Sequence, residues 1–439
     1  MSMNSLLLVN PWIYDFKAFD FWMKPLGLLY VASMLRSSGY EVKLLDCLDR
    51  YHPVLLQEVE DLPKVDKYGR GKFYAEEIEK PERLKAVKRL FKRYGMPKAV
   101  LHEILENTEP PDAILVTSIM TYWYIGLADT IKTIKEHFPE TPVILGGIYA
   151  TLCPEHAKKH SGADIVMPGF AEKNLFSFFT EFKPVDFEEL PFPAFDLYSK
   201  LDYACILTAR GCPFKCNYCA VPKLCNGFLP RPTNKVLEEI EYYQSLGVKH
   251  IAFYDDALLA NPDFSQILDG IIQRGLKLSY HTPNGLHPRF IDQEIAYKMF
   301  EAGFVTIYLS LETVDPRAQK ATGGKVTNNE YVRAVECLKS AGFKNDQIHT
   351  YLLIGMRNDS FESVRSSIDF VLSLGSYPHL AEYSPIPGTA DFVNNNLSVD
   401  DDPLLHNNTI FPVLSSRKRN EMEKIKIYLN RLRTEANLQ

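Results

Sequence analysis

The start of the chain alternates between short apolar runs and a helical pattern. Residues 5–9 form an apolar run that ends at Asn10, which predicts a buried strand. After Pro25, apolar residues recur at intervals of three and four positions as far as Gly39, which predicts a helix. Residues 42–45 form a second apolar run. A strand, a helix and a strand in this order indicate a βαβ unit, and such units form parallel sheets.

The same pattern resumes after a charged region, residues 51–110, which is predicted to be a helical insert. Three further buried strands are predicted at residues 113–118, 143–145 and 163–167, with a helix at 125–138. Basic residues gather in the insert at Arg83, Lys85, Lys88, Arg89, Lys92 and Arg93. They indicate a surface for phosphate or a partner or, as charge clusters more often do, a solvated helix face. Residues 1–185 are therefore predicted to form a flavodoxin-like or Rossmann-like α/β domain with a parallel sheet.

Strands and helices then alternate from about residue 201 onward. The predicted strands are 204–208, 250–254, 277–281, 306–310, 348–354 and 380–384. The predicted helices are 235–246, 262–274, 292–302, 328–341 and 361–374. Six β/α units fall short of a closed barrel, so residues 201–392 are predicted to form an open (β/α)6 partial TIM barrel. The proline-rich residues 186–200 are predicted to be a linker, and residues 393–439 a small C-terminal extension with a helix at 417–432.

Composition narrows the classes of function. The 439 residues include 49 basic and 55 acidic side chains, and the net charge of −6 does not favour nucleic acid as a partner. No apolar window approaches the ~20 residues of a membrane span, and the start of the chain lacks the pattern of a signal peptide. The eight cysteines, three of them close together, are typical of a reducing cytoplasm and not of a disulfide scaffold.

The closely spaced cysteines are Cys212, Cys216 and Cys219, in the sequence R-G-C-P-F-K-C-N-Y-C after a predicted strand. Three thiolates can hold three irons of a [4Fe–4S] cluster and leave the fourth iron open to a small molecule. A zinc site would need four ligands, and Cys205 and Cys225 are the nearest additional candidates. A disulfide with one spare thiol and a set of buried thiols are the remaining alternatives.

This C-x3-C-x-aromatic-C motif resembles the signature of radical S-adenosylmethionine (SAM) enzymes. The resemblance implies that the open iron chelates SAM, and that one electron from the reduced cluster cleaves a C–S bond to give a 5′-deoxyadenosyl radical. It also implies that Tyr218 lies beside the adenine. The alternative is that Tyr218 is an ordinary aromatic side chain packed under the loop. A reductant such as a flavodoxin or a ferredoxin would supply the electron.

Polar residues stand at the ends of predicted barrel strands, where barrel enzymes place their chemistry. Asp255 ends the second strand, and Ser310 with Glu312 ends the fourth. In the family that the motif resembles, positions of this kind contact the methionine amine and the ribose hydroxyls of SAM. A carboxylate suits both because it accepts hydrogen bonds from an ammonium and from hydroxyls. A cap on the following helix is the alternative role for Asp255.

The order of elements over about residues 5–175 resembles the cobalamin-binding domain that precedes the radical domain in one class of these enzymes. The blocks that carry the resemblance are L-G-L-L-Y-V-A-S-M-L-R-S-S-G-Y-E-V, V-T-S-I-M-T, V-I-L-G-G-I-Y-A-T-L-C-P-E-H-A and A-D-I-V-M-P-G-F-A-E. The resemblance implies cobalamin at the carboxyl edge of the sheet, beside Ser118, Gly146 and Gly147. Glycines there allow the backbone of the sheet to approach a ligand, or they form an ordinary tight turn.

The sequence contains no D-x-H-x-x-G motif, so no histidine is available to replace the cofactor's own base. The cobalt would then have no protein ligand below it, and Trp12, Tyr122 or Trp123 would lie on that face.

The resemblance favours a radical SAM enzyme that performs cobalamin-dependent methyl transfer to an unactivated centre. One alternative keeps the radical chemistry and predicts a rearrangement, a cyclisation or a coupling without functional cobalamin. Another alternative is a non-catalytic iron–sulfur sensor or electron carrier, for which four cluster cysteines would be expected. The substrate, a small molecule or a lipid, is not indicated by any motif.

Overall fold

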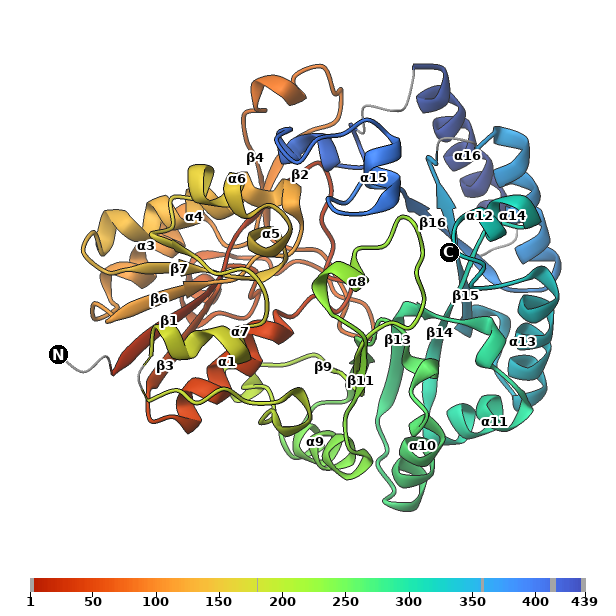
Figure 1. The fold of residues 1–439 in the computed structure, drawn as a ribbon, viewed down its shortest axis with the longest axis horizontal. Helices are drawn as coiled ribbons and strands as arrows, with labels where there is room; N and C mark the ends of the chain where they lie inside the picture. Colours follow the sequence, from red (N-terminus) through yellow and green to blue (C-terminus); the bar gives the residue numbers. More distant parts are fainter. Residues whose placement is uncertain (1–3, 180, 357–358, 411–415, 436–439) are drawn as a thin grey trace. The chain divides into compact units, whose positions relative to one another are not determined.

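The computed structural model describes residues 4–179, 181–356, 359–410 and 416–435, and the chain divides into two compact units (Figure 1). Unit 1 consists of Met1–Cys205, Leu246–Val248 and Val399–His406. Unit 2 consists of Ile206–Ser245, Lys249–Ser398 and Asn407–Gln439. Each unit is built on its own parallel sheet, and the two sheets are the ones predicted from the apolar runs.

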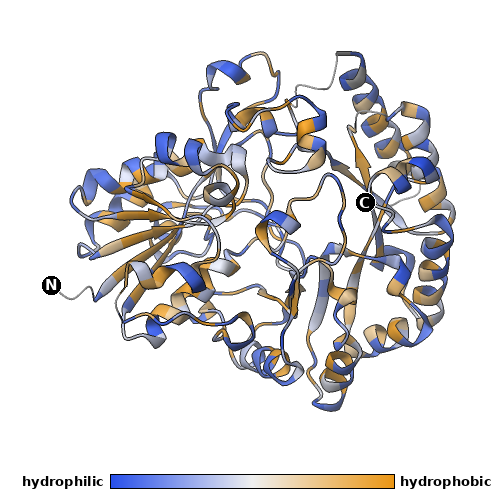
Figure 2. Cartoon of the chain, in the orientation of Figure 1, coloured by the Kyte–Doolittle hydropathy of each residue, from blue (hydrophilic) through white to orange (hydrophobic). Residues whose placement is uncertain are grey.

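The sheet of unit 1 has five strands in the order β3-β1-β6-β7-β8. They are β1 (Ser5–Asn10), β3 (Glu41–Asp46), β6 (Ala113–Val116), β7 (Val143–Leu145) and β8 (Ile165–Val166), and all pair in parallel. The helices are α1 (Leu26–Ser37), α4 (Tyr124–His137), α5 (Gly147–Leu152), α6 (Pro154–His160) and α7 (Ala171–Asn174). Figure 2 shows these strands as largely hydrophobic, because both faces of a parallel sheet are covered. This strand order confirms the flavodoxin-like fold.

The region 51–110, expected as a helical insert, contains strands as well as helices. Its elements are α2 (Pro53–Glu58), β4 (Ala75–Glu77), the 3-10 turn η1 (Glu82–Leu84), β5 (Lys92–Tyr94) and α3 (Lys98–Glu106). β5 lies between β4 and β2 (Ile13–Asp15) in an antiparallel sheet. An apolar cluster of Ile13, Leu48, Phe73 and Tyr94 packs there. The local sequence pattern missed these strands because their partner, β2, is far away in the chain.

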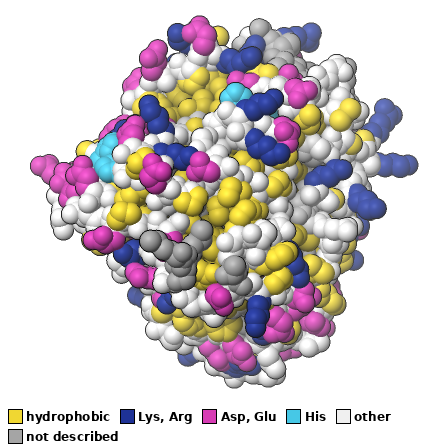
Figure 3. Space-filling model, turned by 60° about the vertical axis from the view of Figure 1, so that its left-hand side comes forward, with side chains coloured by type: hydrophobic (Ala, Val, Ile, Leu, Met, Phe, Trp, Pro, Cys, Tyr) yellow, Lys and Arg dark blue, Asp and Glu magenta, His cyan; other side chains and the backbone are white. Residues whose placement is uncertain are grey.

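The basic residues of the insert do not form one common face. Arg93 pairs with Glu76, and Arg83 pairs with Asp402, whereas Lys88 and Arg89 are exposed. Acidic and basic side chains are also mixed on the face shown in Figure 3.

Two chain segments from outside the predicted domain pack against unit 1. Residues 186–200, expected as a linker, pack along α1, where the Ala194 amide donates to the Leu29 carbonyl oxygen over 3.1 Å. Residues 399–406 come from the C-terminal part of the chain and include the 3-10 turn η9 (Pro403–His406). We call residues 399–406 the strap. The strap contacts the 3-10 turn η2 (Thr121–Trp123), and a 2.9 Å hydrogen bond joins Thr121 Oγ1 and His406 Nδ1.

The sheet of unit 2 has six strands in the order β16-β15-β14-β13-β12-β9. They are β9 (Ala204–Ile206), β12 (His250–Phe253), β13 (Ser279–Leu286), β14 (Phe304–Glu312), β15 (Ile348–Ile354) and β16 (Tyr377–Glu382). The long helices are α9 (Thr233–Ser245), α10 (Phe264–Gln273), α11 (Gln293–Ala302), α13 (Asn328–Ala341), α14 (Phe361–Ser373) and α16 (Ser416–Glu435). The shorter ones are α8 (Val221–Leu224), α12 (Pro316–Ala321) and α15 (Ala390–Asn394). The sheet ends at β9 and at β16, which confirms an open barrel.

Local sequence explains where several of these elements begin and end. α13 begins at a capping box formed by Thr327 and Glu330, and it ends at Gly342, whose φ of 113° is left-handed. α11 likewise ends at Gly303, with a φ of 98°. The last strand lies slightly earlier than the predicted 380–384. Its first residues include Tyr377 and His379, which no apolar run reveals.

Candidate functional site

The motif cysteines, Cys212, Cys216 and Cys219, lie on a loop between two short antiparallel strands, β10 (Ala209–Gly211) and β11 (Phe228–Pro230). Gly211 begins the loop with a left-handed φ of 88°. A Cβ atom at this position would lie 2.2 Å from the carbonyl oxygen of Gly227, so the two strands can approach only because residue 211 is glycine.

The three thiols are partly exposed and form no disulfide. Burial, with smaller contributions from the nearby Cys219 and Cys216, raises the pKa of the Cys212 thiol to about 11. The thiols are therefore close enough to interact. Within the described residues, however, no three His, Cys, Asp or Glu side chains converge on a position for a single metal ion. Three thiolates at this spacing in the chain can hold three irons of an iron–sulfur cluster.

Asp255 holds the backbone that leads into the cysteine loop. It follows β12, its side chain is 3% exposed, and its carboxylate accepts hydrogen bonds from Thr208 N at 3.0 Å, Thr208 Oγ1 at 2.6 Å and Ala209 N at 2.7 Å. Burial raises the pKa of Asp255 to about 7, and these donors oppose the increase. The carboxylate is thus occupied by the chain's own donors. The neighbouring Asp256 accepts from Gly211 N at 3.3 Å.

A buried ion pair of the same unit also fixes this backbone. Arg231, whose side chain is 0% exposed, lies 2.7 Å from Glu239 and donates to the Leu207 carbonyl oxygen over 3.0 Å. Residues 207–209 are therefore held by a cation on one side and by Asp255 on the other. Buried charges fix a position sharply, because a displaced partner would leave an uncompensated charge in a medium of low dielectric.

Ser310 and Glu312 lie near the carboxyl end of β14, as predicted. Ser310 is buried against Gly285, where an added Cβ would lie 2.5 Å from Ser310 Oγ. Glu312 has a φ of 67°, a left-handed conformation that costs a non-glycine residue about 1–2 kcal/mol. The pairing of β14 with β15 shifts register between the two residues. Such a bulge re-aims a side chain, and strained residues of this kind cluster at functional sites.

Lys325 is the residue at this site that sequence reasoning missed. Its Nζ lies 2.5 Å from Glu312 Oε1, and both side chains are largely buried. Burial lowers the pKa of Lys325, but Glu312, Cys216 and Cys219 raise it by more, so the net shift is upward and the lysine stays charged. Gly323, two residues before Lys325, packs closely against the cysteine loop, since a Cβ on Gly323 would lie 3.1 Å from Cys216 Cα. This contact brings Lys325 close to the cysteines. In the sequence, the segment Gly323-Gly324-Lys325 is the feature that could have indicated this lysine.

Several buried polar atoms around the cysteine loop have no hydrogen-bond partner within the described part of the chain. They are Asn217 Oδ1, His287 Nδ1 and Arg289 Nε. Tyr218 lies with Lys325 Nζ 5.9 Å from its ring centroid, and burial raises its pKa. His287 stacks on Phe214 of the loop at 4.6 Å. A buried polar group without a partner costs about 1–3 kcal/mol, so such a concentration indicates a place where a ligand supplies the partners.

The residues of unit 1 that were predicted to bind cobalamin lie together and contact one another. They are Ser118, Gly146 and Gly147. Ser118 Oγ donates to the Gly146 carbonyl oxygen over 2.7 Å and accepts from Tyr149 N at 3.1 Å. A Cβ on Gly147, whose φ is 89°, would lie 2.4 Å from the Ser118 carbonyl oxygen. Gly147 is therefore required by the contact of two loops of the chain, which is the tight turn that stood as the alternative. Gly146 has more room, because its Cβ would lie 3.8 Å from Met167 Cε.

A small cavity of about 20 Å³ lies at the carboxyl edge of the unit 1 sheet. It is lined by residues that follow β1 and β6, together with Leu48. Trp12 is 1% exposed there and donates from Nε1 to the Met96 carbonyl oxygen over 2.9 Å. Trp123 is partly buried and donates to Asp15 Oδ2 over 2.8 Å. The predicted aromatic residues thus gather at this edge, and Tyr122 is buried beside Trp123.

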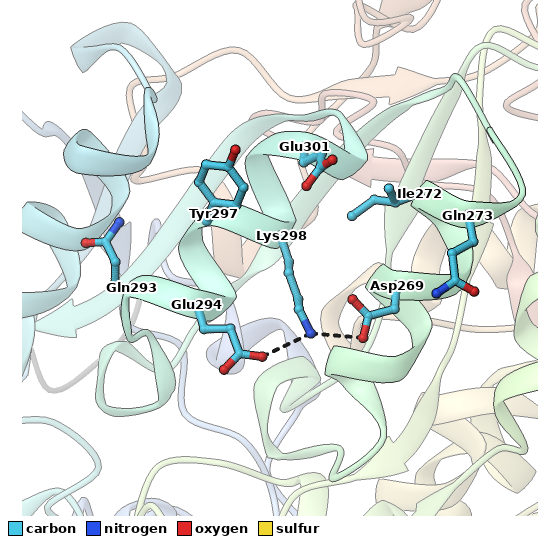
Figure 4. A pocket seen from close by; sticks show the side chains of 8 residues that line it. All are labelled: Asp269, Ile272, Gln273, Gln293, Glu294, Tyr297, Lys298 and Glu301. Atoms are coloured by element: carbon cyan, nitrogen blue, oxygen red, sulfur yellow. Dashed lines mark hydrogen bonds and ion pairs between the residues drawn. The ribbon is translucent and has the colours of Figure 1, made fainter.

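A larger groove of about 540 Å³ lies elsewhere, on the helices of unit 2 (Figure 4). Its lining residues belong to α10 and α11, with Lys298 paired to Asp269 and to Glu294. No strand end contributes to this lining, so the groove is separate from the chemistry described above. Within the described residues, no helix is long and apolar enough to cross a membrane.

Comparison with known families and structures agrees with this arrangement. Residues 206–371 match the family model of the Radical SAM superfamily. An uncharacterized methyltransferase of Pyrococcus horikoshii is 24% identical over 407 residues, which cover 83% of this chain and 77% of that protein. The cytidylyl-2-hydroxyethylphosphonate methyltransferase of Streptomyces wedmorensis is 20% identical over 438 residues, which cover 83% and 76%.

Two solved structures share the fold of most of the chain. One is the radical S-adenosylmethionine methyltransferase TsrM from Kitasatospora setae, with a TM-score of 0.65, 18% identity and coverage of 89% of this chain and 75% of that one. The other is the cobalamin-dependent S-adenosylmethionine radical enzyme OxsB, with a TM-score of 0.59, 15% identity and coverage of 84% and 52%. At this level of identity the likeness concerns the fold.

Proposed function

Since this chain is a radical SAM enzyme with a B12-binding-like N-terminal domain, we propose that it transfers a methyl group to an unactivated centre by cobalamin-dependent radical chemistry. The observation that carries the proposal is the set of three interacting, partly exposed thiols on the loop after β10, next to buried polar atoms that lack partners. The names of the relatives as methyltransferases support the type of reaction.

Cys212, Cys216 and Cys219 would hold a [4Fe–4S] cluster, and their donor chemistry fits it. When bound and reduced, the cluster supplies the electron that cleaves a C–S bond of SAM to give a 5′-deoxyadenosyl radical. The chain's task is to hold SAM and to exclude water. Asp255 acts here as a positioning residue, because its carboxylate fixes the entry to the loop through Thr208 and Ala209.

Glu312 and Ser310 would bind the nucleoside part of SAM, with the Glu312 carboxylate accepting from ribose hydroxyls. Lys325 orients Glu312 through their 2.5 Å contact. Tyr218 would lie beside the adenine, and its hydroxyl is hydrogen-bonded to Cys216 of the cysteine loop.

Cobalamin would lie at the carboxyl edge of the unit 1 sheet and would supply the methyl group. At this edge the loop after β6 presents the partly buried Ile119 and the 42% exposed Met120. Gly146 leaves room beside the loop. The reductant would be a flavodoxin or a ferredoxin, and the site of action the cytoplasm.

The test uses full-length protein purified and reconstituted without oxygen. Wild-type protein should show iron and sulfide bound, reduce the cluster with dithionite, and release 5′-deoxyadenosine or S-adenosylhomocysteine from SAM. Replacing Cys212, Cys216 and Cys219 with alanine should abolish cluster absorption and turnover of SAM. Cys337→Ala, which changes a thiol on α13 outside the motif, is the matched control. Retention of the cluster in the triple variant would refute the proposal.

A further inference from the structure

The ring of Phe214 attaches the cysteine loop to the residues that follow β13. Phe214 lies between Cys212 and Cys216 in the chain. His287, which is 4% exposed, stacks on it with the ring centroids 4.6 Å apart and the planes at 17°. The Arg289 guanidinium lies 5.4 Å from the centroid of the same ring. The loop is therefore held from outside by a ring stack and by a cation–π contact.

Arg289 also holds a second segment, the one that carries Lys325. Its Nη2 donates to the Gly324 carbonyl oxygen over 2.6 Å and lies 3.6 Å from Glu330, the capping-box residue of α13. Gly324 directly precedes Lys325 in the chain. One guanidinium thus contacts the cysteine loop through Phe214 and the Lys325 segment through Gly324.

The backbone that carries Arg289 is itself fixed. Arg289 lies in the 3-10 turn η7 (Pro288–Phe290), which packs on α13. Its carbonyl oxygen accepts a hydrogen bond from Arg333 Nη2 at 3.0 Å. The proline restricts the backbone at the start of the turn. A planar guanidinium with several donors can hold two segments at a fixed spacing when its own backbone is held in this way.

Arg289 places a permanent positive charge beside the cysteine loop, because a guanidinium stays protonated in proteins. Burial lowers the pKa of His287 to about 3, and the charges of Lys325 and Arg289 lower it too, so the imidazole stays neutral. The cation on Phe214 is therefore Arg289. A reduced iron–sulfur cluster carries one more negative charge than the oxidised one, so a nearby cation favours reduction.

We infer that Arg289 is a positioning residue that holds the cysteine loop and the Lys325 segment together and supplies a fixed positive charge to the cluster. The inference rests on the proposed function, since the charge acts on a cluster that the three cysteines would hold. Losing the hydrogen bond to Gly324 should weaken SAM binding, and losing the charge should make the cluster harder to reduce.

Two variants separate the hydrogen bond from the charge. Arg289→Lys keeps a positive charge but loses the planar fork that reaches both segments, whereas Arg289→Met loses both. Isothermal titration with SAM, on full-length protein loaded with its cluster without oxygen, should show that both variants bind SAM about fivefold or more weakly than wild type. Dissociation constants within about twofold of wild type in both variants would overturn the inference.

The reduction potential of the cluster is the measurement that a merely structural role would not move selectively. In Arg289→Met the equilibrium constant for reduction should fall by about tenfold, which makes the midpoint about 59 mV more negative for a one-electron couple. In Arg289→Lys it should stay within about threefold of wild type. A redox titration followed by electron paramagnetic resonance measures both. An unchanged potential in Arg289→Met, or the same shift in both variants, would overturn the inference.

Arg274→Met is the matched control. The Arg274 side chain is 32% exposed, compared with 27% for Arg289, and it pairs with Glu241 at 3.1 Å. Arg274 follows α10, which leads into the amino end of β13. This variant should keep wild-type affinity for SAM and a wild-type potential, and a change as large as that in Arg289→Met would overturn the inference. Wild-type protein that holds no cluster would refute the proposed function, whereas a loaded wild type with unaffected Arg289 variants would overturn this inference alone.

Discussion

The two parallel sheets of this protein end very differently at their carboxyl edges. In unit 2 the edge carries three partly exposed thiols, a buried pair of Glu312 and Lys325, and buried polar atoms without partners. In unit 1, Asn10 is paired with Asp46 and Ser118 with Gly146, and Trp12 is buried at the edge. An unsatisfied buried polar group costs about 1–3 kcal/mol, so the unpaired atoms beside the three thiols favour a ligand at that place. The chemical site can therefore be recognised by what the chain leaves unpaired.

The largest expected effect comes from removing one buried carboxylate in each unit. Asp255 and Asp46 are both 3% exposed, and each accepts three or more hydrogen bonds from the chain. Replacing either with alanine should lower the free energy of unfolding of its unit by about 3 kcal/mol, because buried donors lose their acceptor. Chemical denaturation followed by circular dichroism measures this loss.

Measuring bound iron in the same two variants tests the difference between the two sheet edges directly. Asp255→Ala should lose bound iron, because Thr208 and Ala209 lead directly into the cysteine loop. Asp46→Ala should keep its iron. Equal iron content in both variants would break the distinction between the two edges.

A smaller effect is expected from the ion pair beside the cysteine loop. Glu312→Ala and Lys325→Met should each weaken SAM binding by about 1.5–3 kcal/mol, which is the worth of a hydrogen bond to a charged group. Lys298→Met is the control, because it breaks a partly exposed pair with Asp269 on the helices of the same unit. Isothermal titration with SAM measures the change. Wild-type affinity in Glu312→Ala would remove this residue from the SAM site.

The smallest effect is a pH dependence of unit 1. Burial lowers the pKa of His406 from 6.5 to about 4, against the raising effect of Asp401 and Asp402. The unfolded chain takes up a proton below about pH 6.5 and the folded chain only near pH 4, so stability is lost as the pH falls through this window. The melting temperature should therefore fall by a few degrees between pH 7 and pH 5. His406→Gln should reduce that fall, and an unchanged pH profile in the variant would contradict the assignment.

The sequence predicted what local patterns encode. Apolar runs located the strands of both sheets, and the spacing of Cys212, Cys216 and Cys219 located the chemical loop. Contacts between residues that are far apart in the chain could not be predicted from the sequence. Lys325 approaches Glu312 because a bulge in β14 turns the glutamate, and no periodicity signals that turn. The strands of the insert need β2 as their partner, and the local pattern around Gly147 fitted both a ligand contact and the loop contact it makes.

The strap has a consequence for the order in which the protein matures during synthesis. Unit 1 is covered at η2 by residues 399–406, which leave the ribosome long after residue 205. At about 5–20 residues per second, the intervening stretch takes on the order of 10–40 s to translate. During this interval the nascent first unit lacks the contacts of Asp402 with Arg83 and Tyr124. A chain stopped before residue 399 would keep this surface uncovered permanently and would be a better client for chaperones than the full-length protein.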